Sequence, residues 1–303
     1  MDILEILRDG VLAMIGPVTA AYAISAISLN LQFGYTGLLN FGQVAFMLVG
    51  AYGTAITVEF GGPLWLGVII GLLAGVLLGL LLGLPTLRLR ADYLAITTIA
   101  VAEAIRLIVR SSWAEPITNG VFGIQGFASA FFDMNPFSGG ETYGFGAWVV
   151  TGRRLWLMVV GWLLVSIIML FMRRLIRSPW GRVLKAVRED EDATRSLGKD
   201  VFGYKLQSLM IAGGIGAIAG ILLAFDQQNV TPDAYLPLIT FILYVMVILG
   251  GAGTIIGPLV GALLFQFLFF TFDAVMASAQ ANIGLINNIM TPAEAGQVKL
   301  ILV

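Results

Sequence analysis

Long runs of apolar residues follow one another along the chain, separated by shorter polar stretches. A helix needs roughly 20 apolar residues to cross the hydrocarbon core of a membrane. Because backbone in lipid must satisfy its own hydrogen bonds, such runs indicate helices. The pattern predicts an all-α fold, a polytopic transmembrane bundle of about eight helices that forms a single domain over residues 1–303. The predicted helices lie at residues 11–29, 38–58, 64–84, 93–109, 155–172, 206–225, 236–249 and 254–272.

The two ends of the chain and its shortest run add detail to this pattern. The seventh run is short and bounded by glycine, so we expect a broken or tilted helix there. The chain closes on KLILV, where another apolar run begins, and we expect a ninth, C-terminal helix beyond it. The first ten residues, MDILEILRDG, carry acids where a signal peptide has its basic region. The first run is therefore predicted to be a retained helix.

Composition agrees with a membrane protein and excludes several function classes. Hydrophobic residues make up 58% of the 303, charged residues make up 12%, and the mean hydropathy is +0.93. Soluble domains carry about 25% charged residues. Cysteine and histidine are both absent, which excludes disulfides, thiolate or imidazole metal sites and a Ser–His nucleophile pair. We expect no metal site, no catalytic residue and no enzymatic activity, and the net charge of −1 suggests no nucleic-acid partner.

Basic residues gather on one side of the predicted bundle. Arg88 and Arg90 lie in a loop two helices before the basic segment 173–205, so both loops must face the same side. Because cytoplasmic loops are rich in Lys and Arg, we assign this side to the cytoplasm. The N-terminus and the segment 111–152 are then predicted to be external. The basic residues of segment 173–205 are Arg173, Arg174, Arg177, Arg182, Lys185, Arg188, Arg195, Lys199 and Lys205.

Glycines mark two of the predicted helices for close packing. In the third run a glycine recurs every four residues, which turns about 40° past a full helical turn and forms a slanted groove. Another helix can approach such a groove closely. The sequence GGIGAIAG at residues 213–220 lies within an apolar run and not in the βαβ unit that a dinucleotide fingerprint needs, so we interpret it as helix packing too. The groove residues are Gly67, Gly71, Gly75, Gly79 and Gly83.

Amide side chains gather where the first two predicted helices meet. Asn30, Gln32, Asn40 and Gln43 lie in apolar sequence, and the last two are three residues apart on one helix face. Glycines between them allow a broken or re-entrant backbone, which is a common way to build a solute site. The last three, with Thr97 on the fourth helix, are candidates for lining a translocation path. The alternative is hydrogen bonding between helices, worth about 0.6 kcal/mol per bond.

One carboxylate lies well within a predicted membrane helix. Glu103 and Arg106 are three residues apart on the fourth helix and can pair. Charged residues inside a membrane are candidate functional sites, although a pair near a helix end can equally be a structural clamp. In a secondary transporter driven by an ion gradient, Glu103 would be the coupling carboxylate.

Four sequence blocks occur in the order typical of one transporter family. They read GYTGLLNFGQVAFMLVGAY, LRLRADYLAITTIAVAEAIRLIV, SPWGRVLKAVREDEDATRSLG and ILGGAGTIIGPLVGALL. The chain resembles the permeases of branched-chain amino acid ABC importers, specifically the LivM type of the LivH and LivM superfamily. The resemblance implies a permease for branched-chain or other neutral amino acids in the bacterial inner membrane. A permease for urea or short amides is the alternative.

The resemblance also implies partners. This chain would pair with a homologous second permease in the lipid membrane, and an external protein would bind the solute. Two cytoplasmic ABC ATPases would hold ATP and Mg²⁺, so this chain would bind no cofactor. Segment 173–205 would be the cytoplasmic coupling loop, with a short amphipathic helix over residues 181–197 whose mixed charges pair across the interface. The residues expected to contact an ATPase are Arg182, Arg188, Asp192, Ala193 and Gly198.

Overall fold

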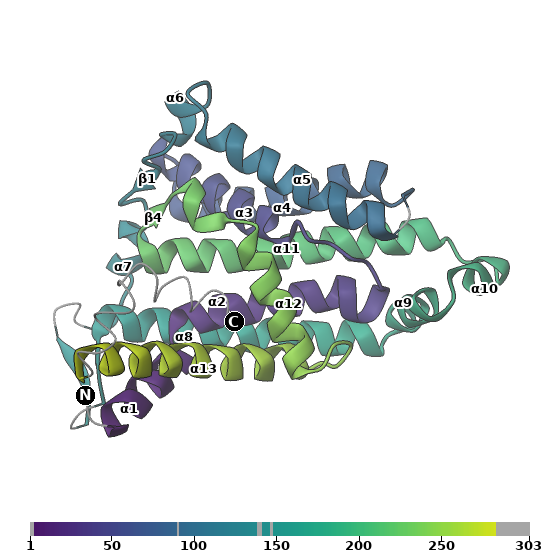
Figure 1. Cartoon of the computed structure of the whole chain (residues 1–303). Helices are drawn as coiled ribbons and strands as arrows, with labels where there is room; N and C mark the ends of the chain where they lie inside the picture. The colour runs from purple at the N-terminus through teal and green to yellow at the C-terminus, as the bar shows by residue number, and fades with distance from the viewer. Residues whose placement is uncertain (1–2, 90, 138–140, 146–147, 283–303) are drawn as a thin grey trace.

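The computed structural model describes residues 3–89, 91–137, 141–145 and 148–282 and shows an elongated helical bundle (Figure 1). Within these residues, strands are confined to two short antiparallel pairs, so the predicted all-α bundle is confirmed. The strand pairs are β1 (Ile124–Gln125) with β4 (Asn229–Val230), and β2 (Thr142–Phe145) with β3 (Trp148–Thr151). The helices are α1 (Ile3–Met14), α2 (Pro17–Asn30), the π-helix η1 (Leu31–Thr36), α3 (Gln43–Glu59), α4 (Leu64–Thr86), α5 (Ala91–Arg110), α6 (Glu115–Thr118), α7 (Ser129–Asp133), α8 (Gly152–Arg177), α9 (Pro179–Glu189), α10 (Glu191–Ser196), α11 (Val201–Gln227), the 3-10 helix η2 (Pro232–Tyr235), α12 (Leu238–Gly250) and α13 (Gly257–Asn282).

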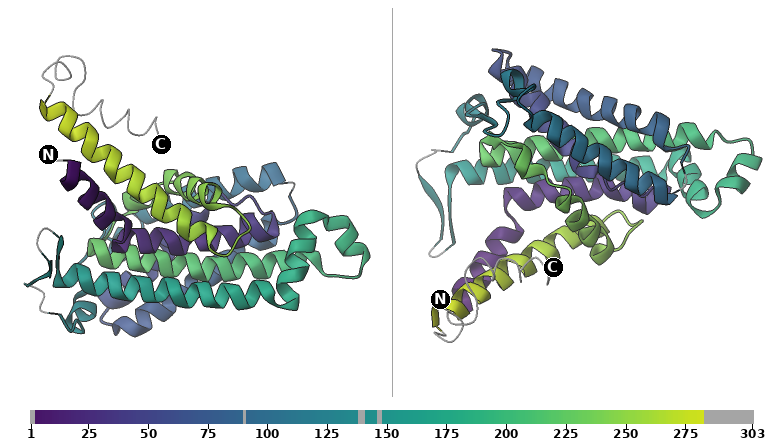
Figure 2. Two further views of the ribbon diagram at one scale, coloured as in Figure 1. Left: turned by 90° about the horizontal axis from the view of Figure 1, so that it is seen from below. Right: turned by 45° about the horizontal axis from the view of Figure 1, so that its top comes forward.

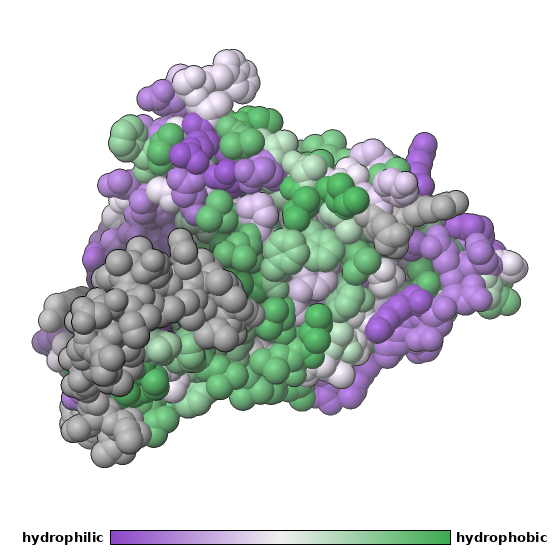
Figure 3. All heavy atoms as spheres, viewed as in Figure 1, coloured by the Kyte–Doolittle hydropathy of each residue, from purple (hydrophilic) through white to green (hydrophobic). Residues whose placement is uncertain are grey.

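A helix covers most of every predicted membrane run, but the runs differ in length and polarity. Five helical segments of the described chain are long and apolar enough to cross a membrane, and the bent pair α1–α2 makes a sixth if it counts as one span. Of the others, α3 has only 17 residues and α5 carries charged side chains. Hydrophobic residues cover the middle of the face in Figure 3 and hydrophilic residues gather toward its ends, as expected for a bundle in lipid. The five segments are Leu64–Thr86, Gly152–Arg177, Val201–Gln227, Pro232–Gly250 and Gly257–Met276.

The first predicted helix is wrong as one continuous element. α1 ends at Met14, α2 begins at Pro17, and the two helices are bent by 46°. Proline at the first helical position lacks an N–H that would have no helical partner there, so it favours a new start. Trp162 of α8 donates its indole N–H to the carbonyl oxygen of Ile15 at 2.7 Å, which satisfies a backbone group freed by the bend. On the N-terminal side of the bend, α1 lies along α13 (Figure 2).

The predicted break between the first two helices is confirmed, and it shortens the second. α2 continues into the π-helix η1, Gly37 takes a φ of +74°, and the chain then runs without helix until α3 begins at Gln43 rather than residue 38. Glycine adopts this left-handed conformation without steric cost, which ends η1. π-helical turns are rare and occur frequently at functional sites.

The glycine groove of α4 holds α3 at one end and α11 at the other. A Cβ atom on Gly67 would lie 2.9 Å from the carbonyl oxygen of Thr54 in α3. One on Gly75 would lie 2.6 Å from the carbonyl oxygen of Gly213 in α11. All five groove glycines are buried. Because only glycine permits this approach, α3, α4 and α11 pack into the central unit of the bundle, which we call the glycine scaffold.

The last two membrane helices meet at a glycine-rich loop. α12 crosses the bundle obliquely (Figure 1), as its short run led us to expect. Gly251, with a φ of +101°, follows α12, and α13 begins at Gly257. α13 extends to Asn282, ten residues past its predicted end, and packs against α12 and α1. The apolar run 299–303, which led us to expect a ninth helix, lies outside the described residues.

Candidate functional site

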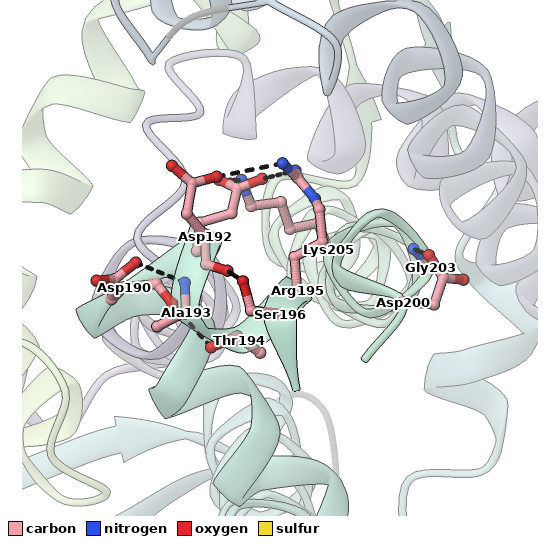
Figure 4. Close-up of polar contacts among 10 residues, drawn as sticks. Asp190, Asp192, Ala193, Thr194, Arg195, Ser196, Asp200, Gly203 and Lys205 are labelled. Carbon is pink, nitrogen blue, oxygen red and sulfur yellow. Dashed lines mark hydrogen bonds and ion pairs between the residues drawn. The ribbon is translucent and has the colours of Figure 1, made fainter. Parts of the chain in front are cut away.

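α9 and α10 form a helical pair that projects from one end of the bundle (Figure 1). The predicted single helix over residues 181–197 is wrong, because Asp190 separates the two helices with an extended backbone at φ −153°. The Asp190 carboxylate accepts a hydrogen bond from the backbone N–H of Ala193 at 2.9 Å (Figure 4). Aspartate is a favoured N-cap residue, so it starts α10 instead of continuing α9.

The charges of α10 are paired within the chain. The guanidinium of Arg195 contacts Glu191 at 3.1 Å and Asp192 at 3.2 Å. Lys205 of α11 forms a further ion pair with Glu191 (Figure 4). Glu191 therefore ties α10 to α11 within this chain, and the pairing of these acids across an interface stays a prediction. Asp192 remains accessible, with a side chain that is 92% exposed.

The tip of the helical pair carries an exposed apolar side chain. Leu197 follows α10 and is 80% exposed. The next residue, Gly198, has a φ of +75°, which favours glycine and turns the chain toward α11. Arg182, Asp192 and Ala193 are exposed on the same pair of helices. All five predicted contact residues, Arg188 included, therefore lie on an accessible surface.

The fifth predicted contact residue, Arg188, is exposed too, but its guanidinium end turns toward the bundle. Its Nη1 atom donates a hydrogen bond to the carbonyl oxygen of Gly34 in η1. Its side chain packs on two glycines: a Cβ atom on Gly37 would lie 3.3 Å from Arg188 Cγ, and one on Gly253 would lie 2.8 Å from Arg188 Nη1. Arg188 therefore joins α9 to both η1 and the loop between α12 and α13.

Asn30, the last residue of α2, holds the same turn. Its Nδ2 atom donates to the carbonyl oxygen of Thr254 at 2.8 Å, and its Oδ1 atom accepts from the backbone N–H of Gly253 at 2.8 Å. A Cβ atom on Gly34 would lie 2.5 Å from that same nitrogen of Gly253. η1 is thus fixed between α9 and the loop after α12. We call this group the η1 junction, and it consists of Asn30, Gly34, Arg188, Gly253 and Thr254.

The three amide residues predicted for a path form one chain of hydrogen bonds, which we call the amide chain. Asn40 Nδ2 donates to Gln32 Oε1 at 2.7 Å, and Gln32 Nε2 donates to Gln43 Oε1 at 3.0 Å. Gln43 Nε2 donates to the Ser28 hydroxyl at 2.9 Å, which in turn donates to the carbonyl oxygen of Ala212 in α11 at 2.6 Å. The four side chains are at most 1% exposed. In this conformation the amides are closed to solvent and satisfied by one another, as buried polar groups must be.

Two further side chains hold the non-helical segment beside the amide chain. Thr98 of α5 accepts a hydrogen bond from the backbone N–H of Phe41 at 3.0 Å. The hydroxyl of Tyr244 in α12 donates to the carbonyl oxygen of Asn40 at 3.2 Å. Thr97, which the sequence suggested for the path, is half-buried on α5 and takes no part in these bonds. No sequence pattern points to Tyr244, because it meets the segment from a helix about 200 residues away.

The predicted pair of Glu103 and Arg106 is present and belongs to a larger cluster at the opposite end of the bundle from α9. Arg106 contacts Glu103 at 2.6 Å and Asp233 of η2 at 2.9 Å. Arg110 contacts Asp233 at 3.1 Å. The Arg106 side chain is 8% exposed, whereas those of Glu103 and Asp233 are 36% and 49% exposed. The cluster joins α5 to η2, which is the geometry of a clamp between elements.

The family model and the relatives found by comparison with known proteins agree on one family. Residues 12–291 match the family model described as branched-chain amino acid transport system / permease component. The chain is 29% identical over 299 residues to a probable branched-chain amino acid transport permease protein LivM of Methanocaldococcus jannaschii, with 87% of this chain and 82% of the relative covered. It is 34% identical over 260 residues to the high-affinity branched-chain amino acid transport system permease protein LivM of Escherichia coli, with 82% of this chain and 61% of that relative covered.

A more distant relative transports a different class of solute. The chain is 24% identical over 262 residues to a nucleoside ABC transporter permease protein of Lactococcus lactis, with 79% of this chain and 74% of the relative covered. No solved structure gave a significant match. The family model nevertheless covers most of the chain, including the η1 junction, the amide chain and the α9–α10 pair. On this evidence, the chain belongs to the permease family of branched-chain amino acid transport systems.

Proposed function

We propose that this chain is the membrane-spanning permease subunit of an ATP-driven importer for branched-chain amino acids. The observation that supports this most directly is the α9–α10 pair, which projects from the bundle and is followed by the exposed Leu197. An exposed apolar side chain within a charged surface suits docking of a partner protein. Two cytoplasmic ATPases would dock on such pairs, one on each permease, and would hold ATP and Mg²⁺.

The proposed orientation places α9 and α10 in the cytoplasm and the N-terminus outside. Leu87 and Leu89, which flank Arg88, line a cavity with Arg188 and Lys205. The two basic loops therefore meet at one end of the bundle, as the positive-inside rule requires. The opposite end, with the Glu103 cluster and the segment 111–152, would face the external solute-binding protein.

The proposal also names the class of solute and the residues that would line its path. The LivM relatives are named for branched-chain amino acids, which favours these solutes over urea or short amides. Gln32, Asn40 and Gln43 are our candidates for lining the path between this chain and a homologous second permease. Because these amides are buried now, they would line it only after the non-helical segment before α3 has moved.

Copurification followed by transport measurement tests this function. The tagged, full-length chain is extracted from its native membrane in mild detergent, and its partners are identified by mass spectrometry. We expect a second permease and two ATPases, and ATP-dependent uptake of labelled leucine when the complex is placed in liposomes with its binding protein. A chain that purifies alone and moves solute down an ion gradient would overturn the proposal.

A surface variant tests the docking site itself. Leu197→Asp should abolish copurification of the ATPases while leaving the chain folded, because it puts a charge where an apolar contact is proposed. The matched control is Leu236→Asp, since Leu236 is also an exposed leucine, at 42%, but follows η2 at the opposite end. Equal ATPase recovery with both variants would place the docking surface elsewhere.

A further inference from the structure

The junction around η1 joins the cytoplasmic helices to the amide chain through very few bonds. Within the described residues, the bond from Arg188 to Gly34 is the one hydrogen bond between α9 and η1. Lys185, one turn earlier on α9, adds a looser contact, with its Nζ atom 5.8 Å from the centre of the Tyr35 ring. A guanidinium bonded to a carbonyl is a charge-assisted hydrogen bond, which is stronger than a neutral one.

The same short helix that Arg188 holds also carries the centre of the amide chain. Gln32 lies in η1, two residues before Gly34, and bonds both Asn40 and Gln43. Any displacement of η1 therefore acts directly on those two bonds. A π-helix has a wider turn than an α-helix and is a rare local geometry, so it can change with less loss than a regular helix.

There is space at this place for α9 to move. A cavity of about 290 Å³ adjoins Arg188 and is lined on the η1 side by Thr36, Gly37 and Leu38. The helical pair is also anchored on α11, a continuous helix of 27 residues in the glycine scaffold. Lys205 of α11 pairs with Glu191 of α10, and Trp180 of α9 donates its indole N–H to Gln207 Oε1 of α11 at 2.8 Å. Movement of the end of α9 reaches η1 through Arg188 and, more loosely, through Lys185.

We propose that Arg188 is a positioning residue that transmits movement of α9 and α10 to η1, and that η1 opens the amide chain. The inference rests on the proposed function, because an ATPase must move the helical pair. It assigns Arg188, although exposed, a role inside the permease through its bond to Gly34. Asn30 resists the movement from the other side by tying η1 to the loop after α12.

The test uses the complete importer in liposomes and the variant Arg188→Met, which keeps most of the side-chain length and removes the donor. We expect ATPase copurification and ATP hydrolysis to stay within about twofold, and solute uptake to fall at least about tenfold, an effect typical of a broken coupling. Arg188→Lys retains a cationic donor and should recover part of the uptake. Arg174→Met is the matched control, because it removes an exposed arginine of α8 at the same end.

A labelling experiment separates transmission from a merely structural role. The chain has no cysteine, so Leu38→Cys places its single thiol in the segment after η1, where Leu38 is 6% exposed. Trapping the importer with ATP and vanadate should raise labelling of this thiol several-fold, and Arg188→Met should remove the rise. Ala219→Cys, buried in α11 of the scaffold, should stay unlabelled throughout.

The possible outcomes distinguish failure of this inference from failure of the proposed function. Uptake by Arg188→Met within twofold of the wild type, loss of ATPase binding, or an unchanged rise in Leu38→Cys labelling would each overturn the inference and leave the proposed function standing. Failure of the wild-type complex to use ATP for uptake would instead overturn the proposed function.

Discussion

The glycine scaffold and the η1 junction both bring backbones into close contact, but they satisfy their polar groups in opposite ways. In the scaffold, the helices bond their own backbones, and glycines such as Gly75 and Gly213 only permit approach. In the junction, backbone groups depend on side chains from elsewhere: Gly34 on Arg188 and Thr254 on Asn30. The first region can shift only by losing packing along whole helices, whereas the second can shift by exchanging single hydrogen bonds.

We therefore expect the glycine scaffold to provide stability and the η1 junction to provide movement. Protein interiors are densely packed, so a contact spread over two helices resists gradual change. A junction of a few directed bonds has discrete alternatives and can respond to one displaced helix. Variants in the scaffold should therefore change unfolding, and variants near η1 should change transport more than unfolding.

The largest expected effect is a loss of stability in the scaffold. A Cβ atom on Gly220 of α11 would overlap the carbonyl group of Met47 in α3, so Gly220→Ala forces the two helices apart. Such overpacking costs about 1–3 kcal/mol, and more where backbone must move. Thermal unfolding of the purified chain in detergent should show a midpoint lowered by several degrees.

The control for that variant lies on the same helix. On Gly214 a Cβ atom would lie 3.0 Å from the Cγ2 methyl group of Val76, a side-chain contact rather than a backbone one. Gly214→Ala should keep or raise the midpoint, because alanine favours a helix over glycine by about 1 kcal/mol. Equal losses for both variants would show that close approach is not what stabilises α11.

The next largest effect is expected on solute uptake, which should differ between a variant of the amide chain and a variant of the glycine scaffold. Gln43→Leu leaves Gln32 and Ser28 without their buried partner, which costs about 1–3 kcal/mol. We expect uptake in liposomes to fall at least about tenfold if the amides line the path. Thr54→Val removes a buried hydroxyl of the scaffold that donates to Gly50 at 3.0 Å and should lower stability while uptake persists. Equal uptake by the two variants would reduce the amide chain to a packing element.

The smallest effect is expected at the opposite end of the bundle. Glu103→Gln removes one charge from a partly exposed cluster, and exposed ion pairs contribute about 0–1 kcal/mol. ATP-driven uptake should remain within about twofold of the wild type, with Asp233→Asn as the control in the same cluster. Abolished uptake with Glu103→Gln alone would instead favour a transporter driven by an ion gradient.

Much of the fold was predictable because hydrophobic length and glycine spacing are local signals. The runs at 64–84 and 206–225 became α4 and α11, and the four-residue spacing of glycines marked the groove between them. The bend at Pro17 and the cap at Asp190 were missed as breaks, although proline and aspartate are familiar helix starts. In both cases a continuous apolar or amphipathic pattern outweighed a single residue.

The sequence predicted the residues of the candidate site better than the hydrogen bonds that join them. Gln32, Asn40 and Gln43 stand out as amides in apolar sequence, and the structure joins them directly. Ser28 and Tyr244 were not predictable, because hydroxyls are common in membrane helices and these two meet the amide chain from α2 and α12. Asp233 likewise reaches Arg106 across more than a hundred residues.

From the sequence alone it follows that this chain is a helical membrane protein and that its basic residues gather at one end of the bundle. The sequence blocks also show which transporter family the chain resembles. These follow from composition and from short-range order, which any continuous stretch of chain contains. Only the tertiary structure decided that Arg188 turns inward to Gly34 and that Asn30 holds Gly253 from the other side. Those bonds join residues 154 and 223 positions apart, and no local pattern encodes a contact that exists only once the helices have packed.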